Sequence, residues 1–115
     1  MPPTACPHWC EADHSAERGQ PFKRHIALIL DLDQRITIWV TRSDTLVGQM
    51  REPERVEVTV ALRTGQVHYI HWDAPAARDA AELLAHVGAD EISHSLRQAA
   101  DLIDPRPTES VPQAR

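Results

Sequence analysis

Four stretches of the chain alternate between apolar and polar residues, which is the period of a β-strand that buries one face. The clearest has valine at every second position from Val56 to Val60, with the polar residues Glu57 and Thr59 between them. The stretches cover residues 25–32, 35–42, 54–63 and 66–72. We therefore predict four strands, of which the third has one face in water.

The links between these stretches predict how the strands pair. Asp33-Gln34 and Thr64-Gly65 are short enough for tight hairpins, and glycine readily adopts the positive φ that such turns need. The middle link, residues 43–53, is longer and is broken by glycine and proline, so it is either a loop or a crossover. We expect an antiparallel meander, with the strand order left open by this link.

After residue 72 the apolar period lengthens to that of an α-helix. Asp73 is a suitable N-cap, Pro75 fits the first turn, and Gly88 ends the run as a residue in the left-handed region does. Asp90 is expected to cap a second helix, which Pro105 ends. The two apolar stripes consist of Ala77, Ala80, Ala81, Leu84 and Val87, and of Ile92, Leu96, Ala99 and Ile103. The expected fold class is α+β: a four-stranded antiparallel meander covered on one face by two C-terminal helices, with an N-terminal Cys/His knuckle.

The tryptophans bear on the uncovered face of the sheet. If the even positions of the second strand face the helices, Trp39 points the other way. Its expected companions are Ile29 and one side of the last strand, either Tyr69/His71 or Ile70/Trp72. Large apolar side chains need cover, and the candidates are the knuckle, with Trp9 packed inward over this face, or a second copy of the chain. The expected interaction surface comprises Trp9, Trp39 and Trp72.

Both cysteines and three of the seven histidines fall within CPHWCEADHSAERGQPFKRH, residues 6–25. Thiolate sulfur and imidazole nitrogen are ligands that zinc prefers, in tetrahedral sets of four. A Cys2His2 set with the spacing C-x3-C-x3-H-x10-H is available, and His8 or Asp13 could replace one member. Its expected members are Cys6, Cys10, His14 and His25. We expect Cys10 and His14 to share one helical turn, and the cofactor to be Zn2+.

Other interpretations of this segment stay open. The two cysteines could be free thiols on a flexible arm, or form a reversible disulfide that senses redox state. A catalytic zinc keeps an open position beside an acid or base, a role that Glu11 or Glu17 could fill in a hydrolase. The sequence has neither H-E-x-x-H nor H-x-E followed by P-C-x-x-C, which favours a structural site.

Composition narrows the class of protein. A chain of 115 residues, 42% of them hydrophobic, can build one modest core. The net charge is −5, and residues 75–104 contain six acidic residues but only two arginines, which disfavours nucleic acid as a partner. A nucleic-acid adaptor that uses Arg18, Lys23 and Arg24 is a weaker alternative. No stretch approaches the roughly 20 apolar residues of a membrane helix, and the start is unlike a secretion signal. We expect a cytoplasmic protein, and a reducing compartment favours metal binding by paired cysteines.

The whole pattern resembles a family of small, uncharacterised actinobacterial proteins that is classed as a domain of unknown function. Its members share an opening Cys-Pro-x-Trp-Cys-x2-Asp-His, here residues 6–14, a further histidine before the first strand, here His25, and a helical part like ARDAAELLAHV and RQAADLI. The likeness covers residues 6–104, and this chain differs in carrying a single histidine between His14 and the strand. The resemblance implies a small intracellular bacterial protein with a Cys/His motif and no particular reaction.

We divide the chain into a metal-binding arm (residues 1–25), an α+β domain (26–104) and a disordered tail (105–115). The first functional hypothesis is a non-enzymatic, zinc-stabilised interaction or regulatory module, whose partner is another protein or a second copy in a homodimer. The alternative is a metal-dependent hydrolase with Glu11 or Glu17 as its acid/base.

Overall fold

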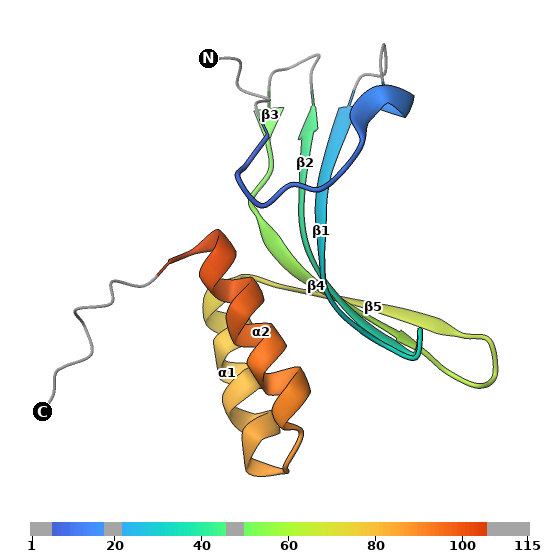
Figure 1. Ribbon diagram of the computed structural model, residues 1–115, viewed down its shortest axis with the longest axis vertical. Helices are drawn as coiled ribbons and strands as arrows, with labels where there is room; N and C mark the ends of the chain where they lie inside the picture. Colours follow the sequence, from blue (N-terminus) through green and yellow to red (C-terminus); the bar gives the residue numbers. More distant parts are fainter. Residues whose placement is uncertain (1–5, 18–21, 46–49, 106–115) are drawn as a thin grey trace, which may run out of the picture.

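The computed structural model describes residues 6–17, 22–45 and 50–105 (Figure 1). Apart from Pro105, the predicted tail lies outside these residues. The elements in chain order are η1 (His14–Glu17, a short 3-10 helix), β1 (Phe22–Leu32), β2 (Ile36–Thr45), β3 (Met50–Arg51), β4 (Arg55–Ala61), β5 (Val67–Trp72), α1 (Ala74–His86) and α2 (Asp90–Ile103). They include all four predicted strands and both predicted helices.

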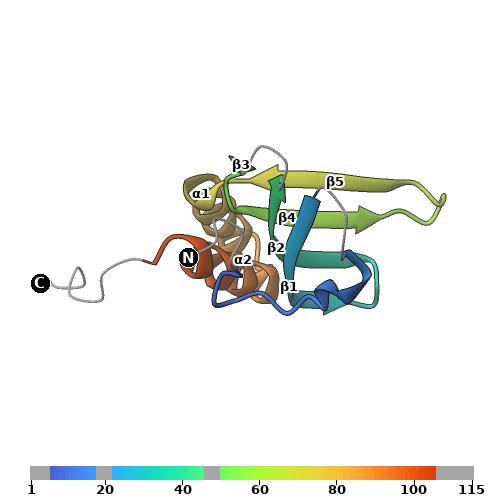
Figure 2. The ribbon, with the colours of Figure 1, turned by 90° about the horizontal axis from the view of Figure 1, so that it is seen from above.

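The sheet is an antiparallel meander in the order β1-β2-β4-β5. Both helices pack on one face of it, so the predicted α+β class is confirmed (Figure 1 and Figure 2). The link between β2 and β4 is not a crossover, because β4 pairs directly with β2 (Thr41↔Arg55), and β3 pairs with the end of β2 on the same side (Asp44↔Arg51). The interpretation of residues 43–53 as a crossover is therefore wrong. Within this link, residues 46–49 lie outside the described residues.

Both predicted hairpins are present. Asp33 and Gln34 have positive φ (53° and 60°), and Arg35 N–H donates to Leu32 O at 2.8 Å, which closes the first. Gly65, at φ 96°, sits in the second, where a side chain would be strained. These two turns set the antiparallel pairing of β1 with β2 and of β4 with β5.

The core lies between the two helices and the face of the sheet that they cover, which we call the helix-bearing face. Ile38, Val40 and Val56 have no exposed surface, and Leu96 of α2 is almost completely buried. The helices contribute small residues to the same layer, namely Ala74, Ala77, Ala81, Ala99 and Ala100. Burying a large apolar side chain is worth about 1.5 to 3 kcal/mol, so this layer stabilises the contact between sheet and helices.

The ends of α1 follow the sequence signals. Asp73 is the N-cap, and its side chain accepts a hydrogen bond from Ala76 N–H at 2.9 Å. Gly88 has a φ of 83°, and its N–H donates to Ala85 O at 3.2 Å. Val87, which we assigned to the apolar stripe, is 76% exposed because the helix ends one residue before it.

The start of α2 differs from the prediction. Its N-cap is Ala89, which makes no side-chain hydrogen bond to the helix. Asp90 is the first helical residue, and its carboxylate interacts favourably with the positive end of the helix dipole. The helices are joined by a buried hydrogen bond from Ser93 Oγ to Ala81 O at 2.7 Å. Among the described residues, no helix is long and apolar enough to cross a membrane.

A β-bulge changes which residues share the open face, the face of the sheet that carries Trp39. The register of β1 shifts between Leu28 and Leu30, so Leu28 lies opposite Trp39 while Ile29 packs against the core. The prediction that Ile29 joins Trp39 is therefore wrong, because the extra residue of the bulge reverses the alternation.

The last strand resolves the other open question about this face. Trp72 lies opposite Val56, on the helix-bearing face, so Tyr69 and His71 are the residues of β5 that share the open face with Trp39. A single interaction surface containing both Trp39 and Trp72 is therefore wrong.

β1 and β2 are longer than predicted at one end. β1 begins at Phe22 and β2 continues to Thr45, and their register runs on through Phe22↔Thr45. His25 consequently belongs to the sheet and not to the preceding arm. This extension of the hairpin provides the platform for the candidate site.

Candidate metal centre

The four predicted ligands converge on this platform. One potential ligand atom from each of Cys6, Cys10, His14 and His25 lies within 4.8 Å of each of the others. Residues 6–17, called the arm below, supply three of them. The arm passes over the sheet and reaches β1, which supplies the fourth (Figure 1). Bond lengths of about 2.0 to 2.3 Å place the ligand atoms of a tetrahedral zinc about 3.3 to 3.8 Å apart. The four residues are therefore arranged so that they could hold one metal ion.

A tight turn brings the two cysteines together. Cys10 N–H donates to Pro7 O at 3.0 Å, which folds Cys6 back toward Cys10. Desolvation and the neighbouring sulfur of Cys10 raise the pKa of the Cys6 thiol. A cation bound by both sulfurs as thiolates would offset the repulsion between their two negative charges.

His14 reaches Cys10 without the predicted helical turn. η1 begins at His14 itself, after Cys10, so the two residues do not share a helix. Cys10 Sγ nevertheless lies 3.4 Å from His14 Nε2. The His14 ring meets the His25 ring edge to face, with 5.0 Å between centroids and 75° between planes.

The two candidate substitutes lie outside the cluster that the described residues form. Asp13 accepts a hydrogen bond from Ser15 N–H at 3.0 Å, and this bond lowers the pKa of the Asp13 carboxyl. Asp13 therefore serves to start η1. His8 is exposed and is not one of the four convergent residues.

His25 is the best-defined ligand candidate. Its side chain has no exposed surface, its Nε2 donates to Asp44 Oδ2 at 2.9 Å, and its buried Nδ1 has no hydrogen-bond partner among the described residues. Burial lowers the pKa of His25 and outweighs the hydrogen bond to Asp44, which raises it. The ring is thus neutral near pH 7, and Nδ1 carries a free lone pair, as metal binding requires.

A buried polar network connects His25 back to the arm. Arg42 donates to both carboxylate oxygens of Asp44, from Nε at 3.0 Å and from Nη2 at 2.9 Å. Burial opposes ionisation of Asp44, but the hydrogen bonds from Arg42 and His25 outweigh it and lower the pKa of Asp44. Arg42 Nη1 lies 4.0 Å from Glu54 Oε2, and Trp9 Nε1 donates to Glu54 Oε1 at 3.0 Å. Trp9, one of the three residues between the two cysteines, is therefore linked through Glu54 and Arg42 to Asp44, the carboxylate that holds His25.

Trp9 packs on the helix-bearing face. It is 6% exposed and belongs to the same apolar cluster as Val40 and Val56. The prediction that Trp9 covers the open face is therefore wrong. The reason is the alternation of the strands, which places His25, Arg42 and the buried valines on the helix-bearing face. The arm, whose Cys10 and His14 lie close to His25, packs on that same face.

Sequence reasoning missed Arg42, Asp44 and Glu54. A signal was available in β2, because Arg42 and Asp44 continue the alternation of Ile38 and Val40 and so occupy inward positions. Charged residues at inward positions of a strand are rare unless they are paired. Their partners depend on the strand register, which the sequence left open.

Glu11, the proposed acid/base of the hydrolase alternative, has a structural role. Its backbone N–H donates to Ile26 O at 2.9 Å, and its carboxylate accepts from Leu28 N–H at 3.4 Å. The arm thereby pairs with the outer edge of β1. Glu17 ends η1, and its side chain lies outside the described part of the structure.

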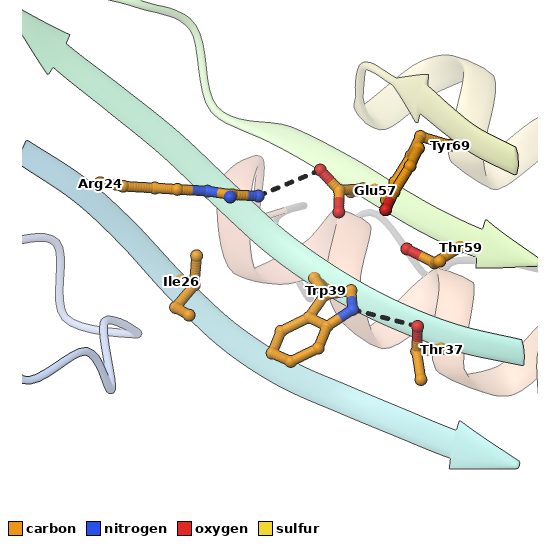
Figure 3. Close-up of a pocket in the computed structure, with 7 residues that line it drawn as sticks. All are labelled: Arg24, Ile26, Thr37, Trp39, Glu57, Thr59 and Tyr69. Atoms are coloured by element: carbon orange, nitrogen blue, oxygen red, sulfur yellow. Dashed lines mark hydrogen bonds and ion pairs between the residues drawn. The ribbon is translucent and has the colours of Figure 1, made fainter. Parts of the chain in front are cut away.

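The open face carries a second feature, a hollow of about 280 Å3 (Figure 3). Trp39 lies across it and donates from Nε1 to Thr37 Oγ1 at 3.1 Å. The side chain of Glu57 is only 10% exposed. Its Oε1 accepts a hydrogen bond from Arg24 Nη2 at 3.2 Å and lies 2.9 Å from His71 Nε2. The hollow is lined by Arg24, Ile26, Thr37, Trp39, Glu57, Thr59 and Tyr69.

No family model, no curated protein and no solved structure matches the chain. The resemblance to the actinobacterial family therefore stays a prediction. The chain is a small α+β domain in which a Cys2His2 group is arranged so that it could hold a metal ion.

Proposed function

We propose that the chain is a non-enzymatic, zinc-stabilised protein-interaction module, in which one Zn2+ is bound by Cys6, Cys10, His14 and His25. The observation that carries the proposal is the buried Nδ1 of His25, which lacks a hydrogen-bond partner among the described residues while Asp44 holds the other ring nitrogen. A buried polar atom without a partner is costly, and a cation beside the two thiols would satisfy it. Zinc-bound histidines are commonly oriented by a carboxylate in this way.

The donor set supports zinc over other metals. Magnesium and calcium take oxygen ligands, whereas two sulfurs and two imidazole nitrogens that lie within 4.8 Å of one another suit zinc. Two thiolates also cancel the charge of the ion. A neutral site of this kind can lie next to the fully buried His25 side chain.

A closed set of four ligands supports a structural role for the ion. The arm carries one buried large apolar side chain, Trp9, which is too little for a core of its own. An ion shared with β1 would hold the arm against the sheet, and metal binding would then supply part of the folding free energy.

The interaction role rests on the open face. With the arm and both helices on the other face, Leu28 (42% exposed) and Tyr69 (64% exposed) remain in solvent on either side of the half-buried Trp39. Protein interfaces are enriched in tyrosine and tryptophan at an apolar centre that a polar rim surrounds, and this face combines both kinds of side chain. The proposed partner is therefore another polypeptide.

Metal analysis of the purified chain tests the zinc proposal. We expect close to one zinc per chain, and loss of zinc together with a lower melting temperature in Cys10→Ser. His8→Ala is the matched control, because His8 lies in the same arm but outside the cluster, and it should keep both the metal and the melting temperature. Wild-type protein that binds no zinc under reducing conditions would reject the proposal.

Cobalt substitution separates the structural site from the hydrolase alternative. A closed Cys2His2 set should give the intense visible bands of tetrahedral cobalt, and small anions should leave them unchanged because no ligand position is open. A spectrum that shifts on adding azide or thiocyanate would show an open position and contradict the structural role.

A further inference from the structure

The two outer strands of the sheet differ in how their edges are covered. At the β1 edge, Ile26 O and Leu28 N–H are both paired with Glu11 of the arm, and the bulge at Ile29 interrupts the next positions. At the other border, β5 has β4 on one side and no described strand on its other side (Figure 2). One edge is occupied and the other is open.

The sequence of β5, VHYIHW, lacks the usual protection of an open edge. Natural proteins blunt such edges with lysine, proline, inward charges or bulges. β5 has no proline, lysine, arginine or acid, and its register with β4 is unbroken. Val67, Tyr69 and Ile70 are 44%, 64% and 36% exposed. These features are typical of a strand that pairs with another strand.

Hydrogen-bond alternation identifies which backbone groups face outward. In antiparallel pairs, each residue turns its N–H and C=O either toward a given neighbour or away from it. Ala61 N–H donates to Arg35 O and Leu62 N–H donates to Gln66 O, so odd residues of β4 bond to β2 and even residues bond to β5. By the same register, even residues of β5 face β4. The outward N–H and C=O groups, which face no described strand, therefore belong to Val67, Tyr69 and His71.

We propose that a second copy of this chain pairs with β5, antiparallel, about a two-fold axis at Tyr69. In this register the outward groups of Tyr69 bond to those of Tyr69 of the partner subunit, and those of Val67 bond to those of His71 of the partner subunit. Side chains directly opposite each other then share a face, so both open faces lie on one side and both helix pairs on the other. Every outward donor meets an acceptor.

The strand is also chemically complementary to itself, which favours a second copy over an unrelated segment. It carries no acidic or permanently basic side chain, so no like charges meet across the axis. The two Tyr69 rings would lie opposite each other on the open face, where aromatic cross-strand pairs are favourable. The hollow that Tyr69 lines would then continue into its symmetry-related copy. This inference rests on the proposed interaction role but not on the zinc.

Analytical ultracentrifugation of the zinc-loaded chain under reducing conditions tests the pairing. A single strand pair buries little area, so we expect a monomer–dimer equilibrium in the micromolar range. Tyr69→Lys and Tyr69→Glu should each be monomeric, because they place like charges opposite each other, and mixing the two should restore a dimer. Leu83→Lys is the matched control, since Leu83 is 63% exposed on α1 and not part of β5, and it should dimerise like the wild type.

Three results would overturn the pairing: a wild-type chain that stays monomeric at every concentration, charge variants that dimerise like the wild type, or a mixture that stays monomeric. Amide exchange gives an independent readout, because Tyr69 N–H should gain protection with protein concentration while Ile70 N–H, which bonds to β4, is protected throughout. Zinc content measured on the same samples keeps the proposals separate: a metal-free dimer contradicts only the zinc site, and a zinc-loaded monomer contradicts only the pairing.

Discussion

The two ends of the helix-bearing face are stabilised in different ways. At the helix end, the inward side chains of β2 are Ile38 and Val40, which pack with Leu96 of α2 and with alanines of α1 and α2. At the arm end, the inward side chains of the β1–β2 hairpin are His25, Arg42 and Asp44, all buried and all polar. One strand, β2, passes from the first environment into the second within a few residues.

The difference follows from what covers each end. An amphipathic helix brings enough apolar surface to bury a sheet by the hydrophobic effect alone. The arm brings Trp9 and otherwise small or polar residues, so hydrogen bonds and the proposed ion must hold it. Buried charges are tolerable only when every partner is in place. The comparison teaches that the helix end should fold without metal, whereas the arm end should depend on it.

The largest expected effect is at the helix end. Leu96→Ala removes a fully buried side chain and should lower the free energy of unfolding by about 2 to 5 kcal/mol, because it leaves a cavity. Chemical denaturation measures this loss, and the folded fraction should still bind zinc at the wild-type stoichiometry. The exposed Leu83→Ala is the control and should change stability little. A Leu96→Ala protein that folds normally but loses zinc would break the separation of the two ends.

An intermediate effect is expected at the arm end. Asp44→Asn keeps the shape of the side chain but removes the charge that orients His25, so zinc affinity should fall by about 10- to 100-fold. Competition with a chromophoric chelator measures the change. Asp31→Asn makes the same substitution on an exposed carboxylate of β1 and should leave the affinity unaltered. An unchanged affinity in Asp44→Asn would contradict the role of the Asp44 charge in orienting His25.

The smallest effect should come from the cap of α1. Asp73→Ala removes the hydrogen bond to Ala76 N–H and should cost about 1 kcal/mol of stability, with no change in zinc affinity. Thermal unfolding of the zinc-loaded protein, compared with the exposed Asp79→Ala, measures it. A fall in zinc affinity would mean that the helices and the arm are coupled more strongly than their separate packing implies.

Much of the fold follows from periodicity. The alternation of valines in β4, the positive-φ turns at Asp33 and Gly65, and the cap at Asp73 are local signals, and local signals were sufficient for the meander and the helices. These local signals do not determine the register in which the strands pair. The bulge beside Ile29 and the faces taken by Trp9 and Trp72 depend on which residues of neighbouring strands meet, and a shift of one residue reverses each of them.

The candidate site divides in the same way. Cysteine and histidine are the residue types that zinc prefers as ligands, so residue type and spacing were enough to indicate Cys6, Cys10, His14 and His25. The residues that orient the site, Arg42, Asp44 and Glu54, are common surface types. Their role emerges only when the hairpin places Asp44 beside His25 and the arm places Trp9 beside Glu54.

X-ray absorption spectroscopy at the zinc edge of the purified, reduced chain tests the central claim most directly, because it reports the atoms bound to the ion. The account predicts two sulfur neighbours at about 2.3 Å and two imidazole nitrogens at about 2.0 Å, with no further ligand. A first shell without sulfur, or one completed by oxygen in place of an imidazole, would contradict it.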